Sequence, residues 1–184
     1  MTKEYSPDRL DVKAFAQAGA RLSGHDTLLK YQRLVEEAKG LHPDLRVDWT
    51  ATGELRGLPG GETQVWLHLT VDASLPMTCQ RCLHPVDVPL AVARAFRFVA
   101  DEATAEALDD ESEEDLLAIS REFNLRELIE DELLMALPVV PRHDTCPAEV
   151  RLSSSDDDFE QANAQKPNPF AALAQLRTDK PAKK

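Results

Sequence analysis

Between residues 45 and 73 the chain alternates apolar and polar side chains with a period of two. Odd-numbered positions carry the apolar residues in two runs, 45–55 and 65–73. The segment 58–61, Leu-Pro-Gly-Gly, separates the two runs and has the composition of a turn. Alternation of this kind predicts half-buried strands, and the turn predicts that they pair as an antiparallel hairpin.

A third alternating run covers residues 86–98, where the even-numbered positions are mostly apolar. Pro89 lies within this run, and proline is tolerated best in a strand at the edge of a sheet. A short loop containing Cys79 and Cys82 separates the second and third runs. The middle of the chain is therefore predicted to be an antiparallel meander of at least three strands.

Helices are predicted before this sheet. Asp11 is a candidate N-cap for a helix over 12–20. Asp26 or Thr27 is the candidate N-cap of a second helix that continues to Ala38, with Gly40 after its end. The apolar face of this second helix is expected to pack in the core. Its members are Leu28, Tyr31, Val35 and Ala38.

One more helix is predicted after the sheet. Asn124 can cap it, Glu127 occupies the capping-box position, and Pro138 ends it. Its predicted buried face consists of Leu125, Leu128, Ile129, Leu133 and Ala136. Its predicted outer face includes Arg126, Glu130 and Asp131.

Two acidic stretches and a distinct tail complete the organisation. Residues 101–115 contain nine Asp or Glu and no Lys or Arg, which predicts an extended acidic loop, and a short strand is expected around 116–120. Residues 151–165 are interpreted as a flexible acidic linker. Residues 166–184 are interpreted as a docking tail with a short helix from Pro169 to Leu176. The overall prediction is a single α+β domain over 1–150 followed by linker and tail.

The tail has two possible roles. Three apolar residues follow the polar linker, and the linker would give them reach toward a partner protein. Folding of the tail back onto its own domain is the alternative. The predicted docking residues are Phe170, Leu173 and Leu176.

Composition narrows the function. The 184-residue chain has a formal net charge of −12, which opposes wholesale binding of nucleic acid and favours a basic protein partner. The three cysteines do not suggest a secreted disulfide framework, and no leader or membrane-spanning run is expected, so the predicted location is the cytoplasm. No phosphate-binding glycine loop, His-Glu-x-x-His or serine nucleophile motif is present. A binding protein without a small-molecule substrate is therefore favoured over an enzyme.

Cys79 and Cys82 form a Cys-x-x-Cys pair, a spacing that lets both thiolates reach one metal ion. His143 and Cys146 are the residues that could complete a tetrahedral zinc site, with His84 as a spare candidate. In the alternative, both cysteines pack at the turn and His143 lies in solvent. A redox role is less favoured, because Pro85 and a strand follow the pair where a redox motif needs a helix.

A basic patch near the cysteines is the candidate RNA-binding surface. It would direct RNA contact to one face of an acidic protein. The alternative is a set of isolated surface charges. The predicted members are Arg81, Arg94, Arg97 and Arg142, with His143 beside them.

Three motifs in this order resemble the bacterial YceD family, the large ribosomal RNA subunit accumulation proteins. They are Cys79-Gln80-Arg81-Cys82-Leu83, the segment 128–138 with Pro141, His143 and Cys146 beyond it, and the segment 165–173. Where relatives carry a second cysteine pair, this chain has His143 and Cys146. The resemblance implies a non-enzymatic role in accumulation of 23S ribosomal RNA and in large-subunit biogenesis.

Two classes of function follow. In the first, the protein is an assembly factor that contacts precursor ribosomal RNA or a basic large-subunit ribosomal protein. In the second, it is a zinc-stabilised acidic adaptor that does not contact RNA.

Overall fold

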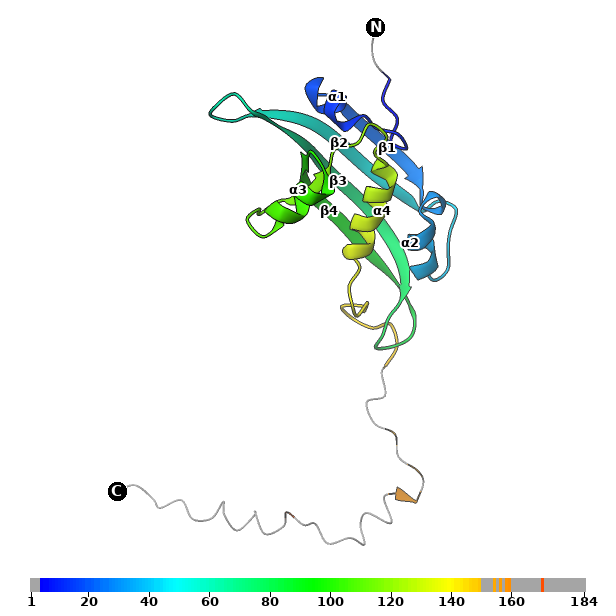
Figure 1. The fold of residues 1–184 in the computed structure, drawn as a ribbon. Helices are drawn as coiled ribbons and strands as arrows, with labels where there is room; N and C mark the ends of the chain where they lie inside the picture. The colour runs from blue at the N-terminus through cyan, green and yellow to red at the C-terminus, as the bar shows by residue number, and fades with distance from the viewer. Residues whose placement is uncertain (1–3, 150–153, 155, 157, 160–169, 171–184) are drawn as a thin grey trace, which may run out of the picture. The chain divides into compact units, whose positions relative to one another are not determined.

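The computed structural model describes residues 4–149, 154, 156, 158, 159 and 170 (Figure 1). Residues Met1–Pro147 form one compact unit. The linker predicted at 151–165 and the tail predicted at 166–184, including its short helix, lie almost entirely outside the described residues, so they stay predictions. No helix among the described residues is long and apolar enough to cross a membrane.

A five-stranded sheet forms the centre of this compact unit, with the order β1-β2-β3-β4-β5. Neighbouring strands are antiparallel except for the parallel pair β4–β5. The predicted meander is confirmed as β2, β3 and β4, and the predicted strand near 116–120 is confirmed as β5. The bounds are β1 Arg21–Thr27, β2 Arg46–Gly57, β3 Thr63–Thr78, β4 Pro85–Val99 and β5 Asp115–Ala118.

Helix α4 lies across one face of this sheet, with α1 and α2 toward opposite ends of the same layer (Figure 1). The core forms where Phe15 of α1 and Leu125, Ile129 and Leu133 of α4 meet the inward-facing residues of β2, β3 and β4. The helical bounds are α1 Val12–Gln17, a 3-10 turn η1 Leu28–Lys30, α2 Gln32–Glu37, α3 Glu102–Asp109 and α4 Leu125–Met135.

The N-terminal region differs from the predicted pair of helices. Asp11 caps α1 as expected by accepting the N–H of Ala14 at 3.0 Å, but this helix ends at Gln17. Asp26 or Thr27 was predicted to cap a second helix running through Ala38, and this is wrong. Both residues belong to β1, only a 3-10 turn follows Thr27, and α2 covers Gln32–Glu37. Strand β1 forms because β2 offers a pairing edge, and local sequence does not report such a long-range partner.

Two glycines let other elements approach the sheet. A Cβ at Gly24 would lie 2.5 Å from the ring of Trp49, so this glycine leaves room for the indole against β1. A Cβ at Gly53 would lie 2.7 Å from Phe15 and 2.8 Å from the backbone of Ala16. Glycine at this position of β2 therefore permits α1 to pack directly on the strand.

The acidic segment 101–115 was predicted to be extended, and this is wrong for most of its length. Asp101 caps α3 by accepting the N–H of Thr104 at 2.8 Å. Ala105 is buried, so packing of this helix offsets the repulsion between its carboxylates.

Asn124 caps α4 as predicted, since its side chain accepts the N–H groups of Arg126 and Glu127. Two predictions about the faces of this helix are wrong. Ala136 is exposed, because it is the C-cap residue and lies beyond the last buried turn. Glu130 was predicted to lie outside and is buried.

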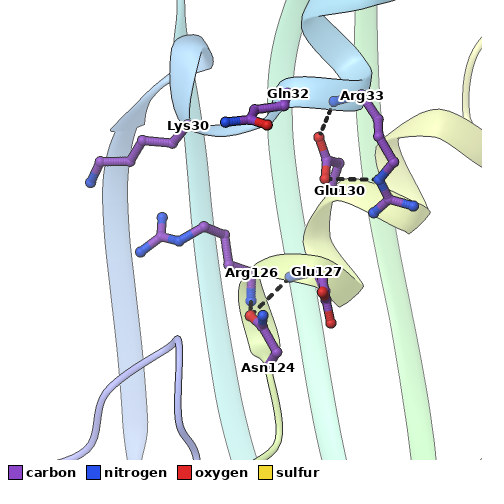
Figure 2. A pocket seen from close by; sticks show the side chains of 7 residues that line it. All are labelled: Lys30, Gln32, Arg33, Asn124, Arg126, Glu127 and Glu130. Atoms are coloured by element: carbon purple, nitrogen blue, oxygen red, sulfur yellow. Dashed lines mark hydrogen bonds and ion pairs between the residues drawn. The ribbon is translucent and has the colours of Figure 1, made fainter.

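Burial of Glu130 has a specific cause at the start of α2. The N-cap residue Tyr31 makes no side-chain cap for α2, and the carboxylate of Glu130 accepts the N–H groups of Arg33 and Leu34 at 2.8 and 3.3 Å instead. It also accepts Nε of Arg33 at 3.0 Å (Figure 2). A residue of α4 thus caps α2 from about a hundred positions away in the sequence.

A hollow of about 280 Å³ lies between α2 and the start of α4 and is lined by Lys30, Arg33 and Arg126, among others (Figure 2). Each of these three cations has a carboxylate partner. Lys30 pairs with Asp26, Arg33 with Glu130, and Arg126 with Asp26. The hollow is therefore a structural junction lined by cations that already have carboxylate partners.

Candidate metal centre

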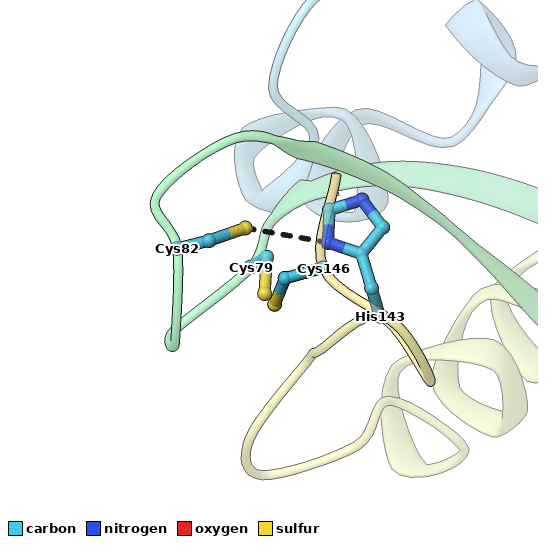
Figure 3. Close-up of side chains that lie close together, drawn as sticks. All are labelled: Cys79, Cys82, His143 and Cys146. Atoms are coloured by element: carbon cyan, nitrogen blue, oxygen red, sulfur yellow. Dashed lines mark hydrogen bonds between the residues drawn. The ribbon is translucent and has the colours of Figure 1, made fainter. Parts of the chain in front are cut away.

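Four side chains from two distant segments converge beyond the end of the sheet. Cys79 directly follows β3 and Cys82 lies in the turn before β4, whereas His143 and Cys146 belong to the segment after α4. One ligand atom from each residue lies within 4.8 Å of all the others (Figure 3). The convergence predicted for these four residues is therefore present in the folded chain.

The β3–β4 turn places both of its cysteines on one side. The N–H of Cys79 donates to the carbonyl of His84 at 2.9 Å, and the N–H of Leu83 donates to the carbonyl of Cys79 at 2.8 Å. Leu83 has φ of 61°, a left-handed conformation that is unusual for a residue other than glycine or asparagine. This tight turn directs the sulfurs of Cys79 and Cys82 toward a common point.

The β3–β4 turn donates hydrogen bonds to the segment after α4 and so holds that segment in place. The N–H of Gln80 donates to the carbonyl of Pro141 at 2.8 Å. The guanidinium of Arg81 donates to the carbonyl of His143. These bonds hold the second pair of candidate ligands opposite the first pair.

The imidazole of His143 is oriented as a metal-binding histidine would be. Its Nε2 lies 2.9 Å from the carbonyl of Pro85, which can only accept a hydrogen bond, so Nε2 carries the proton. Nδ1 then carries a lone pair, which accepts a hydrogen bond from Sγ of Cys82 at 3.4 Å. A backbone carbonyl that fixes the tautomer of a ligating histidine is a usual outer contact of metal sites.

The thiols differ in their tendency to ionise. Burial opposes ionisation of Cys79, but backbone N–H groups of Cys82, His143 and Arg81 donate to its sulfur and lower its pKa to about 5. Burial, together with hydrogen bonds to Cys82 and Cys79, raises the pKa of Cys146 to about 11. One thiolate is thus favoured beside a protonated thiol, and a bound divalent cation would favour ionisation of both.

The donor set fits zinc. Three sulfurs and one imidazole nitrogen are a common structural zinc set, and tetrahedral bonds of about 2.3 Å place sulfur ligands roughly 3.8 Å apart. The separations here, 4.8 Å or less, are close to that requirement. His84, the spare candidate, lies outside the cluster, with Nδ1 2.8 Å from the carbonyl of Cys82.

A family model described as "Large ribosomal RNA subunit accumulation protein YceD" matches residues 67–177. The chain belongs to the YceD family. The matched region begins within β3 and includes all four residues of the cluster. The resemblance carried by the three sequence motifs is thereby confirmed.

A YceD relative from Haemophilus influenzae, named "Large ribosomal RNA subunit accumulation protein YceD", is 34% identical over 110 residues. The match covers 58% of this chain and 62% of the relative, so it spans less than two thirds of the relative's length. No solved structure matches the chain.

The four arginines predicted to form an RNA-binding patch are not brought together. Arg81 lies in the β3–β4 turn, and Arg142 is exposed next to His143. Arg94 of β4 pairs with Asp115 and Glu132. This arginine is about 30 Å along the strand from Pro85, at roughly 3.3 Å per residue.

Arg97 lies still further along β4, with Nε 2.6 Å from Glu114 and Nη2 donating to Ser112 at 2.7 Å. The structure therefore places two of the predicted RNA-binding residues beside the cysteine cluster and two in ion pairs at the other end of the strand. Of the predicted docking residues, Phe170 is 68% exposed, and Leu173 and Leu176 lie outside the described residues.

Sequence reasoning missed an internal network centred on Asp26. Its Oδ2 accepts hydrogen bonds from Trp49, Arg126 and Tyr31 at 2.8, 2.8 and 3.1 Å, and its Oδ1 accepts Lys30 at 2.7 Å. From the sequence, Asp26 was interpreted as a helix cap. Only the fold shows that its carboxylate accepts hydrogen bonds from donors on β2 and α4.

Proposed function

We propose that this YceD-family protein supports accumulation of 23S ribosomal RNA and biogenesis of the large ribosomal subunit in the cytoplasm. It would do so as a binding factor without catalytic turnover. Membership of the family carries this proposal, since the matching model and the relative from Haemophilus influenzae both bear that description. The expected partners are precursor ribosomal RNA or a basic large-subunit ribosomal protein.

The test is depletion of the protein in cells, followed by measurement of subunit profiles and of the ratio of 23S to 16S ribosomal RNA. We expect the 23S species and the large subunit to fall relative to the small subunit. An unchanged ratio on depletion would refute the role.

Within this function, the Cys79, Cys82, His143 and Cys146 cluster is proposed to hold one structural zinc ion. Four protein ligands would fill a tetrahedral coordination sphere and leave no open position for substrate, which is the arrangement of structural sites. The ion would join the β3–β4 turn to the segment after α4. These two segments are about sixty residues apart in the chain and meet only in the folded state, so the free energy of binding the ion would add to the stability of the fold.

Metal analysis of protein purified without chelator should give one zinc per chain. Cys82→Ser should lose the metal and melt at a lower temperature, because one ligand is removed. His84→Ala is the matched control, since His84 lies two residues away and outside the cluster. Zinc content near zero in the wild type, or equal metal content in both variants, would contradict the zinc assignment.

A second function, a zinc-stabilised adaptor that does not contact RNA, is favoured by the ion pairs of Arg94 and Arg97. Both guanidinium groups already bind carboxylates, which weakens their attraction for phosphate. Ribonuclease treatment during purification of the protein with its partners separates the two functions. Partners that stay bound after digestion would support the adaptor, and partners lost on digestion would support contact through RNA.

The tail is proposed to dock onto a partner through Phe170, Leu173 and Leu176. Deletion of residues 160–184 should abolish association with ribosomal particles and leave the melting temperature unchanged. A large fall in melting temperature would show instead that the tail belongs to the fold.

A further inference from the structure

The outer edge of β4 carries backbone groups that β3 does not use. Register between β3 and β4 is continuous from Thr78↔Pro85 to Val65↔Phe98. The carbonyl of Val99 accepts the N–H of Ile119, and the carbonyl of Pro85 accepts His143. Odd-numbered residues of β4 therefore direct their backbone groups away from β3, since this direction alternates along a strand.

Parallel strand β5 covers this edge only at Phe96–Val99. From Asp87 to Ala95, the described part of the chain supplies no second strand, so N–H and C=O groups of Asp87, Ala91 and Ala93 remain available. Pro89 has the same outward direction, so its missing N–H costs no bond to β3. Proline at such a position also weakens indiscriminate edge pairing.

Two hollows lie along this open edge, and the two together are called the groove. Its first part, about 710 Å³, lies between the beginning of β4 and the segment after α4. Its second part, about 310 Å³, lies between the middle of β4 and the end of α4. The lining of the two parts is mixed. Its apolar members include Val86, Val88, Val140, Val92, Met135 and Ala136, and its charged members are Asp87, Arg142, Asp144, Arg94 and Glu132.

The opposite face of the sheet is acidic next to the same edge. Asp48, Asp72 and Ala91 are consecutive cross-strand partners on β2, β3 and β4. Asp48 already contacts the imidazole of His25 on β1, so Asp72 is the carboxylate of this row nearest the edge. Asp72 is exposed and lies one strand in from the edge, and Asp87 is exposed on the edge strand itself. A lysine on an added strand opposite Ala91 could extend over this small side chain to Asp72.

We propose that the edge of β4 at residues 87–95 binds an extended basic segment of a partner protein by strand addition. Alternate side chains of the segment would enter the groove against its apolar residues, and the lysines or arginines between them would face Asp72 and Asp87. The chain's net charge of −12 opposes a second copy as the occupant and favours a basic one. The proposal rests on the proposed function and takes the second of its two expected partners, the basic ribosomal protein.

The groove also connects this surface to the cysteine cluster. Arg142 and His143 line its first part, and His143 bonds to the carbonyl of Pro85 at the start of the same edge. A metal ion that fixes His143 would therefore fix one wall of the binding site. Strand addition provides backbone bonds, and the groove and carboxylates provide selection among extended segments.

The test uses the full-length metal-loaded protein and a synthetic peptide of alternating lysine and valine long enough to span residues 87–95. We expect it to bind, whereas the same peptide with glutamate in place of lysine should not. Ala91→Pro removes an outward N–H and should weaken binding on the order of fivefold, and Pro89→Ala adds one and should strengthen it similarly. Ala91→Ser is the matched control and should bind as the wild type does.

Asp72→Asn should weaken binding of the lysine peptide by roughly twofold, because an exposed ion pair contributes little. Melting curves and zinc content establish that each variant is folded. If Ala91→Pro does not fold, the affinity of Pro89→Ala for the lysine peptide still tests the proposal. Absence of binding at millimolar peptide, or equal affinity of all edge variants, would overturn the proposal. A dimer that Ala91→Pro dissociates would assign the edge to a second copy and would also overturn it.

Complementation of depleted cells separates this inference from the proposed function. If depletion lowers 23S ribosomal RNA and folded Ala91→Pro restores it fully, the edge proposal fails and the function stands. If depletion leaves 23S ribosomal RNA unchanged while the peptide binds as expected, the docking surface stands and the proposed function fails.

Discussion

Replacement of Asp26 by asparagine removes the charge at the centre of the internal network. In the wild type, the carboxylate receives four donors, from Lys30, Tyr31, Trp49 and Arg126. Asparagine has one acceptor oxygen and a donor group in place of the second oxygen. At least one donor therefore loses its partner, and among the described residues Arg126 keeps its ion pair with Asp8 alone.

The expected loss follows from the pKa of Asp26. Burial alone would raise this pKa, but hydrogen bonds from Lys30 and Trp49 and the charge of Arg126 lower it from 3.8 to about 2. At ~1.36 kcal/mol per pH unit, the folded state prefers the ionised form by roughly 2 kcal/mol. Asp26→Asn should thus reduce the free energy of unfolding by about 2–3 kcal/mol at pH 7, since a donor is also left unsatisfied.

The effect should disappear in acid. Because the pKa of Asp26 is lower in the folded state than in the unfolded state, its stabilisation is complete above the unfolded pKa, near 4. It is lost as the pH falls from about 4 to about 2. The wild type should lose this stability across that window, whereas the asparagine variant has no carboxyl at this position to titrate.

Urea unfolding at a series of pH values measures this difference. Asp8→Asn is the matched control, because Asp8 pairs with the same Arg126 but its side chain is 60% exposed, against 11% for Asp26. Asp8→Asn should lower the free energy of unfolding by less than about 1 kcal/mol. Equal losses for the two variants, or a loss at Asp26 that persists unchanged at pH 2, would refute the role given to burial.

Two further predictions concern packing and capping. Gly24→Ala should lower the free energy of unfolding by about 2–3 kcal/mol, because the new methyl would meet the ring of Trp49 at 2.5 Å. A methyl at Gly57 of β2 meets no atom within 4 Å, so Gly57→Ala should leave thermal melting nearly unchanged. Glu130→Gln should lower the free energy of unfolding in urea by about 2 kcal/mol, since it weakens the buried cap of α2. Asp131→Asn, at the next and exposed position, should lower it by less than about 0.5 kcal/mol. Equal costs within either pair would contradict the corresponding contact.

Periodicity along the chain was sufficient for the elements whose faces differ in polarity. Strands β2, β3 and β4 alternate strongly, and the turn at 58–61 joins β2 to β3, so their pairing was predictable. Asn124 and Asp11 are capping residues whose hydrogen bonds are local, and both were identified correctly. The cysteine spacing also identified the metal-binding candidates before their convergence was seen.

The sequence alone could not identify interactions whose partners are distant in the chain. Strand β1 depends on pairing with β2, the polar residue Glu130 is buried because the start of α2 lacks a local cap, and Asp26 is held by donors from three other segments. Local propensity and charge predicted the opposite for each of these residues, because the compensating groups lie 20 to 100 positions away. The sequence by itself determined the alternating strands, the local caps and the residue types of the candidate metal cluster. Only the tertiary structure decided which polar groups are buried and which strand edge stays open, because burial and pairing depend on the segments that meet in space.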